Sequence, residues 1–278
     1  MPAFFLITGL VSSFGKRTFF DEVFYNFKIL MIPNFSLSVG IPISSYILRG
    51  GDYEVYLNVI LDFCKTGGFW FLISLFFNKI LFGILVRKFT NSIILLISLV
   101  CLFIGVILSN NNFTNILYYQ NALILLPYLS IGYLLRDKIN RYLNKYILLV
   151  AILISYSAVI SICFITQYSL PVISQNVSIK TIEIPLFLLM ATLGSFSCLI
   201  VSALIKFNKY MEYIGRETLV IYIFHMYFLI KIIQNIPTDC NINGYILGIG
   251  IIFVCLILCT ISNILIVHTP LKIILGKF

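Results

Sequence analysis

Apolar stretches dominate this chain, and short polar intervals separate them. A helix that crosses a bilayer needs about 20 apolar residues. Nine stretches reach or approach this length, at residues 1–14, 29–48, 69–86, 92–109, 120–135, 146–166, 184–205, 217–235 and 245–267. No domain boundary or internal repeat interrupts them. The pattern predicts an all-α fold, with residues 1–278 forming a single polytopic transmembrane helix bundle of about nine helices.

The intervals alternate in basic content. Those after the first, third, fifth and seventh stretches, together with the C-terminal tail, hold 14 of the 19 Lys and Arg residues. The other intervals hold 3, and Lys79 and Lys231 lie inside apolar stretches. Because cytoplasmic loops accumulate Lys and Arg, the alternation predicts a multi-pass protein of the inner (plasma) membrane. It places Met1 and the interval 49–67 on the exported side and the interval 15–28 in the cytoplasm. The mixture of basic and aromatic residues in 15–28 favours a helix at the lipid headgroups.

Composition agrees with this assignment. Only 10% of the residues are charged and the mean hydropathy is +1.05, whereas soluble proteins carry about 25% charged residues. The net charge of +9 is spread over short intervals and forms no patch, so we expect membrane lipids and no nucleic acid as partners. Seven cysteines without paired spacing predict neither a disulfide framework nor a metal site. The abundance of Ile, Asn, Lys, Phe and Tyr indicates an AT-rich bacterial genome.

Two groups of polar residues could line a cavity. In the eighth stretch Thr218, Tyr222 and His225 share one helix face. They could contact a substrate and handle protons, or only bond neighbouring helices. Arg216, at the cytoplasmic end, could bind a phosphate or act as a topological anchor.

The second group lies in the third stretch. Trp70, Ser74 and Asn78 have helical spacing, and Lys79 lies beside them. This stripe could form a cavity wall, and Lys79 could equally extend its amine to the membrane surface. Sequence motifs for nucleotide-binding loops, serine hydrolases and zinc proteases are absent. Carboxylates within the stretches are too scarce for a carboxylate-driven transporter.

Several separated motifs resemble one family, the membrane-bound acyltransferase 3 family. They are Met1-Pro2-Ala3-Phe4-Phe5-Leu6-Ile7-Thr8-Gly9, Phe69-Trp70-Phe71-Leu72, Leu129-Ser130-Ile131-Gly132-Tyr133-Leu134-Leu135-Arg136, Tyr213-Ile214-Gly215-Arg216-Glu217-Thr218-Leu219 with Tyr222 and His225, and Thr269-Pro270-Leu271. Lys28 matches one member of a basic pair that the family carries near its third helix. Each motif alone is weak, but their order spans the whole chain.

The resemblance implies a membrane-bound O-acyltransferase, in particular an O-acetyltransferase that modifies a cell-surface carbohydrate such as an exopolysaccharide. The donor would be acyl-CoA (acetyl-CoA) from the cytoplasm, with no bound cofactor. Arg216 and Lys28 are the candidates for contacting its phosphates, Tyr222 and Trp70 for the cavity wall, and His225 is a weak catalytic candidate. The family implies about ten helices, and the first, which carries its reactive Arg and His, would precede Met1. We therefore expect this chain by itself to have little or no activity.

A non-enzymatic polysaccharide flippase or export protein is the alternative. A glycan polymerase ranks lower, because such enzymes usually have a large exported loop and the exported intervals here are about 20 residues at most.

Overall fold

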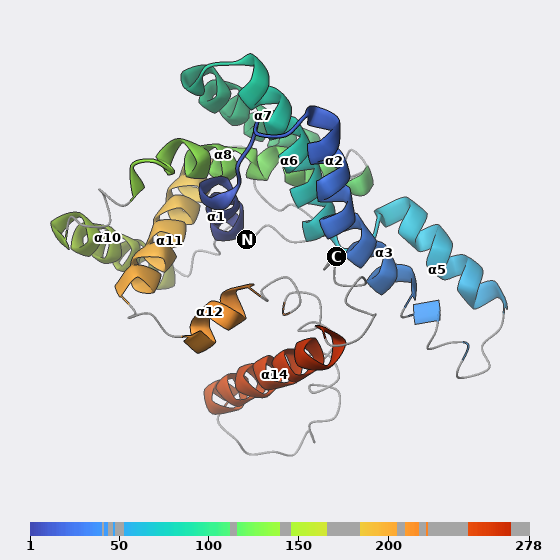
Figure 1. The fold of residues 1–278 in the computed structure, drawn as a ribbon. Helices are drawn as coiled ribbons and strands as arrows, with labels where there is room; N and C mark the ends of the chain where they lie inside the picture. Colours follow the sequence, from blue (N-terminus) through green and yellow to red (C-terminus); the bar gives the residue numbers. More distant parts are fainter. Residues whose placement is uncertain are drawn as a thin grey trace. The chain divides into compact units, whose positions relative to one another are not determined.

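The computed structural model of the chain describes residues 1–40, 42–43, 47, 53–111, 116–139, 146–165, 184–204, 209–216, 221 and 244–267. Every regular element in these ranges is a helix (Figure 1), which confirms the all-α class. The chain divides into two compact units, Met1–Ile205 and Lys206–Phe278.

The first unit contains most of the helices. In chain order these are α1 (Pro2–Val11), α2 (Phe19–Asn26), η1 (Phe27–Met31), α3 (Ile32–Phe35), η2 (Ser36–Gly40), α5 (Tyr53–Thr66), α6 (Trp70–Lys88), α7 (Asn91–Asn110), η3 (Ile116–Tyr118), α8 (Tyr119–Leu135), α10 (Tyr146–Ile165) and α11 (Ile184–Leu204). The second unit contains α12 (Lys209–Arg216) and α14 (Gly244–Val267). Within the second unit, the buried Cys259 of α14 directs its thiol toward the carbonyl of Ile221, at 3.9 Å.

Three segments of the described residues are long and apolar enough to cross a membrane. They are Tyr56–Lys88, which includes the junction of α5 and α6, then Asn91–Asn110 and Ile184–Ser202. Pro2–Val11 and Ile152–Ser161 are shorter apolar helices. The chain is thus an α-helical protein with membrane-spanning character, whereas a bundle of nine crossings stays a prediction. Of the stretch 217–235, the structure describes only Ile221.

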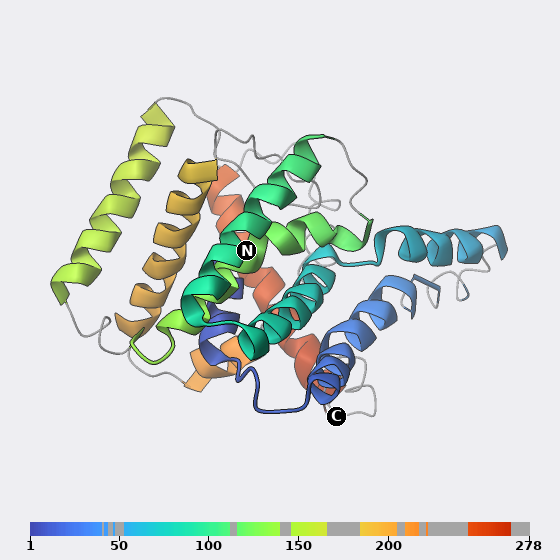
Figure 2. The ribbon, with the colours of Figure 1, turned by 90° about the horizontal axis from the view of Figure 1, so that it is seen from above.

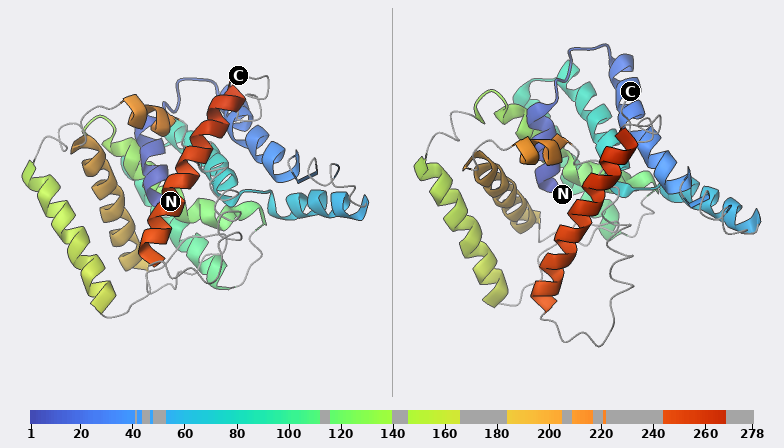
Figure 3. Two further views of the ribbon diagram at one scale, coloured as in Figure 1. Left: turned by 90° about the horizontal axis from the view of Figure 1, so that it is seen from below. Right: turned by 60° about the horizontal axis from the view of Figure 1, so that its bottom comes forward.

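Helix α8 is the centre of the first unit. It packs against α1, α6 and α7, and Ile124, Leu125, Tyr128 and Leu129 on it are fully buried. The crossing with α1 is close: a Cβ added to Gly132 would collide with the carbonyl oxygen of Leu6. Small residues let membrane helices approach this closely, which explains Gly9 and Gly132 in the family motifs. On the other side of α1, α11 lies beside α10 (Figures 2 and 3).

Helix α2 lies inside the interval 15–28, where a helix at the lipid headgroups was expected, and it begins at Phe19. Thr18 caps it, since its Oγ1 accepts a hydrogen bond from the N–H of Asp21 at 3.2 Å. The helix then continues to Gly40 through two π-helical segments that flank Pro33, where proline lacks the N–H of a regular helix. The interval 49–67, expected as an exported loop, contains α5, because its apolar and polar residues alternate at helical spacing.

A candidate anion-binding pocket at the α1–α2 link

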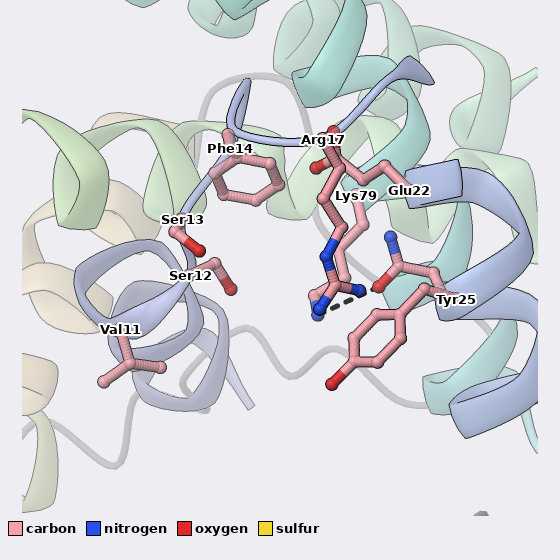
Figure 4. A pocket seen from close by; sticks show the side chains of 9 residues that line it. Val11, Ser12, Ser13, Phe14, Arg17, Glu22, Tyr25 and Lys79 are labelled. Carbon is pink, nitrogen blue, oxygen red and sulfur yellow. Dashed lines mark hydrogen bonds between the residues drawn. The ribbon is translucent and has the colours of Figure 1, made fainter. Parts of the chain in front are cut away.

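A polar pocket of about 260 Å³ lies between the C-terminal end of α1, the α1–α2 link, α2 and the middle of α6. Its lining comprises Val11, Ser12, Ser13, Phe14, Arg17, Glu22, Tyr25, Asn26 and Lys79. Figure 4 shows Arg17, Lys79 and Tyr25 extending into one space, with Ser12 and Ser13 on the opposite side. Segments from three parts of the sequence therefore meet around this pocket.

The link between α1 and α2 sets the position of one wall. Its turn includes Gly15, whose φ of 80° is a conformation that glycine adopts without strain. The Thr18 cap fixes the start of α2. Glu22, Tyr25 and Asn26 then follow at i, i+3 and i+4, a spacing that places them on one helix face. This face lines the pocket.

Lys79 enters the pocket from the middle of α6. Its Nζ donates a hydrogen bond to Oδ1 of the buried Asn26 at 3.2 Å (dashed in Figure 4). Of the two interpretations that the sequence allowed for Lys79, the structure favours a place in a cavity wall over an amine that reaches the membrane surface. The hydrogen-bond partner is neutral, so this contact does not form an ion pair.

Arg17 is the second cation of the pocket. Its guanidinium carbon lies 4.1 Å from the ring centroid of Tyr25, a cation–π contact worth about 0.5–1 kcal/mol at an exposed site. Among the described residues, neither Arg17 nor Lys79 has a carboxylate within ion-pair distance. The two side chains therefore bring two positive charges without ion pairs to the same pocket.

Glu22 is the one carboxylate in the lining, and it is bound to Arg87. The Arg87 Nη2 to Glu22 Oε2 distance is 2.5 Å. Arg87 also donates to the carbonyls of Gly83 at 2.6 Å and Arg17 at 3.0 Å. Arg87 thus neutralises Glu22 and fastens the α1–α2 link to α6. At the other end of the link, Arg136 donates to the carbonyl of Ser12 at 3.3 Å.

These charges define what the pocket can do. Two cations and two serine hydroxyls can hold an anion, and arginine in particular matches the oxygens of a phosphate with a two-pronged donor. The lining offers no general base, since its only carboxylate is paired. No group of three or more His, Cys, Asp or Glu suited to a metal occurs in the described part of the chain. The lining residues thus support the binding of an anion.

The structure does not place the residues expected from the sequence around this pocket. Lys28 lies on η1 with its Nζ 4.8 Å from the ring centroid of Phe24. Trp70 begins α6 and packs edge-on against Phe71, with ring centroids 6.1 Å apart. Arg216 is the last residue of α12, and Tyr222 and His225 lie outside the described residues. Their roles stay predictions.

The rest of the Trp70 stripe has structural partners. Ser74 donates to the carbonyl of Tyr118 at 3.4 Å, and Asn78 donates to that of Ala122 at 2.8 Å. Both side chains are fully buried. These two residues therefore join α6 to the start of α8 and do not line the polar pocket.

Sequence reasoning undervalued Arg17 and Lys79. A signal existed for Lys79, because a cation inside an apolar stretch usually faces a polar cavity. Nothing in the sequence signalled that Arg17, 62 positions earlier, would share that cavity, because the pairing depends on the packing of α2 against α6.

Helices with the length and apolarity to cross a bilayer define the class as an α-helical membrane protein. Its cationic pocket is a candidate anion site. A comparison with family models identifies the family: the acyltransferase domain model matches residues 1–268. The chain therefore belongs to the acyltransferase 3 family, as its motifs predicted. No curated protein and no solved structure matches it.

Proposed function

We propose that this protein is a multi-pass O-acyltransferase of the inner membrane that transfers an acyl group, in particular acetyl, from acyl-CoA to a hydroxyl of a cell-surface carbohydrate. Family membership supports acyl transfer and membrane location in general terms. The donor, the acceptor and the membrane are our inferences from the resemblance and from the distribution of basic residues.

The observation that carries the proposal is the pair of cations without ion pairs in the polar pocket. Coenzyme A carries several phosphate groups, and Arg17 and Lys79 lie together without carboxylate partners. The pocket adjoins the interval 15–28, which the charge pattern predicts to be cytoplasmic, where acyl-CoA is found. Its 260 Å³ is slightly below the range of about 300–1,000 Å³ for sites that enclose a small ligand. It therefore suits the phosphates better than the whole donor.

Electrostatics explains why such a ligand would bind. Placing the half-buried Lys79 ammonium in a membrane protein without an ion pair costs solvation free energy. A phosphate would offset this cost, and hydrogen bonds to charged groups contribute about 1.5–3 kcal/mol each. Loss of one such bond should raise the dissociation constant roughly 10- to 150-fold, since about 1.4 kcal/mol is a factor of ten.

The transfer itself needs groups beyond this pocket. The acceptor oxygen must attack the thioester carbonyl carbon while a base takes the hydroxyl proton. The carbon–sulfur bond then breaks and coenzyme A leaves as the thiol after protonation. His225 is our candidate for contact with the acceptor hydroxyl, on the strength of the family motif alone.

Binding in lipid nanodiscs tests the proposal without requiring turnover. We expect acetyl-CoA to bind, and Arg17→Gln and Lys79→Met each to weaken binding at least tenfold in isothermal titration. Lys16→Gln is the matched control, because Lys16 is exposed, adjacent in sequence and outside the lining. Equal affinities for acetyl-CoA and for acetyl-pantetheine, which lacks the phosphates, would contradict the phosphate role.

A cell-based measurement separates the enzyme from the export protein. In a host that carries the natural gene, deletion should remove O-acetyl groups from the surface carbohydrate and leave its export unchanged. Loss of export with normal acetylation of the remaining polymer would instead support the flippase alternative.

A further inference from the structure

A second pocket, of about 420 Å³, lies among η1, α3, α5 and α6. It is lined by Phe27, Met31, Asn34, Phe35, Phe63, Cys64, Gly67, Ile73, Phe76, Phe77 and Leu117. It shares no lining residue with the polar pocket. Asn34 is the only lining residue with a strongly polar side chain, so this pocket favours a hydrocarbon ligand.

Asn34 adds little polarity to the interior, because both its amide nitrogen and its amide oxygen bond the backbone of the rim. Its Nδ2 donates to the carbonyl of Gly67 at 2.6 Å, and its Oδ1 accepts from the N–H of Phe69 at 2.8 Å. These bonds hold the α5–α6 turn, where Gly67 and Gly68 have φ values of 76° and 90°. The turn therefore fixes one end of the pocket while leaving its surface apolar.

The exposed side of α5 consists of an apolar sector and a polar sector, which run side by side along the helix. Phe63 attaches it to the unit by an edge-on contact with Phe35, with ring centroids 5.3 Å apart. One exposed sector is apolar and contains Leu57, Ile60, Leu61 and Cys64. The adjoining sector is polar and contains Glu54, Asn58, Asp62 and Lys65. Such a division is typical of a helix at the boundary between lipid and water.

The apolar sector is continuous with the pocket. Cys64 belongs to both, since it is exposed and also lines the pocket. Phe27 and Phe35, on the opposite wall, are 48% and 53% exposed. The pocket therefore opens beside the exposed apolar sector of α5. Most of α5, and all of α6, which follows it after three residues, lie in the segment Tyr56–Lys88 that is long and apolar enough to cross a membrane.

We propose that the pocket among η1, α3, α5 and α6 binds one acyl chain of a bilayer phospholipid. The occupant follows from the apolar aromatic lining, the opening beside the exposed apolar sector of α5 and the division of that helix into apolar and polar sectors. The bound chain covers aromatic surface that a bundle in the membrane would otherwise leave as a void, and voids cost dispersion contacts.

Lipid retention measures the site directly. We expect native mass spectrometry of the detergent-purified chain to show one phospholipid retained per protein. Cys64→Phe fills the pocket from its rim and should abolish retention. Leu61→Phe is the matched control, because Leu61 is exposed on the same apolar sector but does not line the pocket. Equal retention by both variants would overturn the proposal.

A fluorescence measurement gives an independent readout that does not depend on mass. Trp70 is the only tryptophan, so Trp70→Phe provides a background into which Phe76→Trp places a reporter in the pocket. Phospholipids with brominated chains should quench it, and the quenching should persist after transfer to detergent. Phe103→Trp, at an exposed position on α7, should lose its quenching on the same transfer. An equal loss of quenching at both positions on transfer to detergent would show that the pocket holds no lipid specifically.

The Phe76→Trp reporter also tests whether the pocket binds the acyl chain of a long-chain acyl-CoA instead of a phospholipid chain. If excess palmitoyl-CoA relieves the quenching at Phe76→Trp while acetyl-CoA does not, the pocket holds the acyl chain of a donor, and the phospholipid assignment is wrong. If palmitoyl-CoA leaves the quenching unchanged, the phospholipid assignment stands, whatever the result of acetyl-CoA binding at the polar pocket.

Discussion

At the residue scale, the charge balance of the polar pocket depends on a single carboxylate. Glu22 is held by Arg87 and faces the same space as Arg17 and Lys79. Its negative charge should oppose the binding of any anion there, while its ion pair with Arg87 ties α2 to α6. One side chain therefore acts on binding and on stability in opposite directions.

Replacing Glu22 tests both effects. We expect Glu22→Gln to tighten acetyl-CoA binding, because the pocket gains positive charge, and to lower the free energy of unfolding by about 0.2–1 kcal/mol, the range of partly exposed ion pairs. Titration and thermal unfolding in nanodiscs measure the two quantities. Glu54→Gln, an exposed carboxylate on α5, should change neither, and weaker donor binding by Glu22→Gln would refute the electrostatic argument.

At the element scale, the start of α2 depends on one threonine. Thr18 caps the helix that carries three pocket residues, whereas Thr90, at the same position of α7, makes no side-chain capping bond. Thr18→Ala should therefore cost about 1 kcal/mol of stability and weaken donor binding. Thr90→Ala should be close to neutral in both thermal unfolding and titration. Similar effects of the two substitutions would mean that the cap does not organise the pocket.

The crossing of α1 and α8 is a second prediction at this scale. A Cβ at Gly132 would meet a backbone carbonyl, which no side-chain rotation relieves. Gly132→Ala should thus lower stability by at least the 1–3 kcal/mol that is typical of overpacking. The matched control is Gly40→Ala in η2, where a Cβ would contact nothing within 4 Å. Thermal unfolding in detergent compares them, and an unaffected Gly132→Ala would contradict the close crossing.

At the scale of the whole molecule, the orientation in the membrane is open to measurement. The distribution of basic residues predicts that the interval 136–145 is cytoplasmic and that α5 is exported. In a cysteine-free background, a membrane-impermeant thiol reagent added to intact cells should label Asn58→Cys and not Lys138→Cys. After permeabilisation both should react. The reverse pattern would place the polar pocket away from cytoplasmic acyl-CoA and would exclude the proposed donor site.

The amino-acid sequence by itself determined the class, the family and most helix positions. A long apolar stretch can be recognised within a single segment of sequence, without knowledge of the tertiary structure. Helices α6, α7 and α11 could therefore be located from the composition of their segments alone. The family motifs are equally local, and the match over residues 1–268 confirms them. Amphipathic segments were harder: the interval 15–28 indicated a helix at the headgroups without its bounds, and α5 carries enough charge to resemble a loop.

Only the tertiary structure decided which side chains meet. Lys79 and Asn26 are 53 positions apart, and Arg87 and Glu22 are 65 apart. Each pair forms because α2 packs against α6. Ser74 and Asn78 fit a cavity wall by periodicity, yet they bond the backbone of η3 and α8, because periodicity specifies a helix face and not what covers it. The apolar pocket likewise exists only because Asn34 holds the α5–α6 turn, a contact between helices that no local pattern contains.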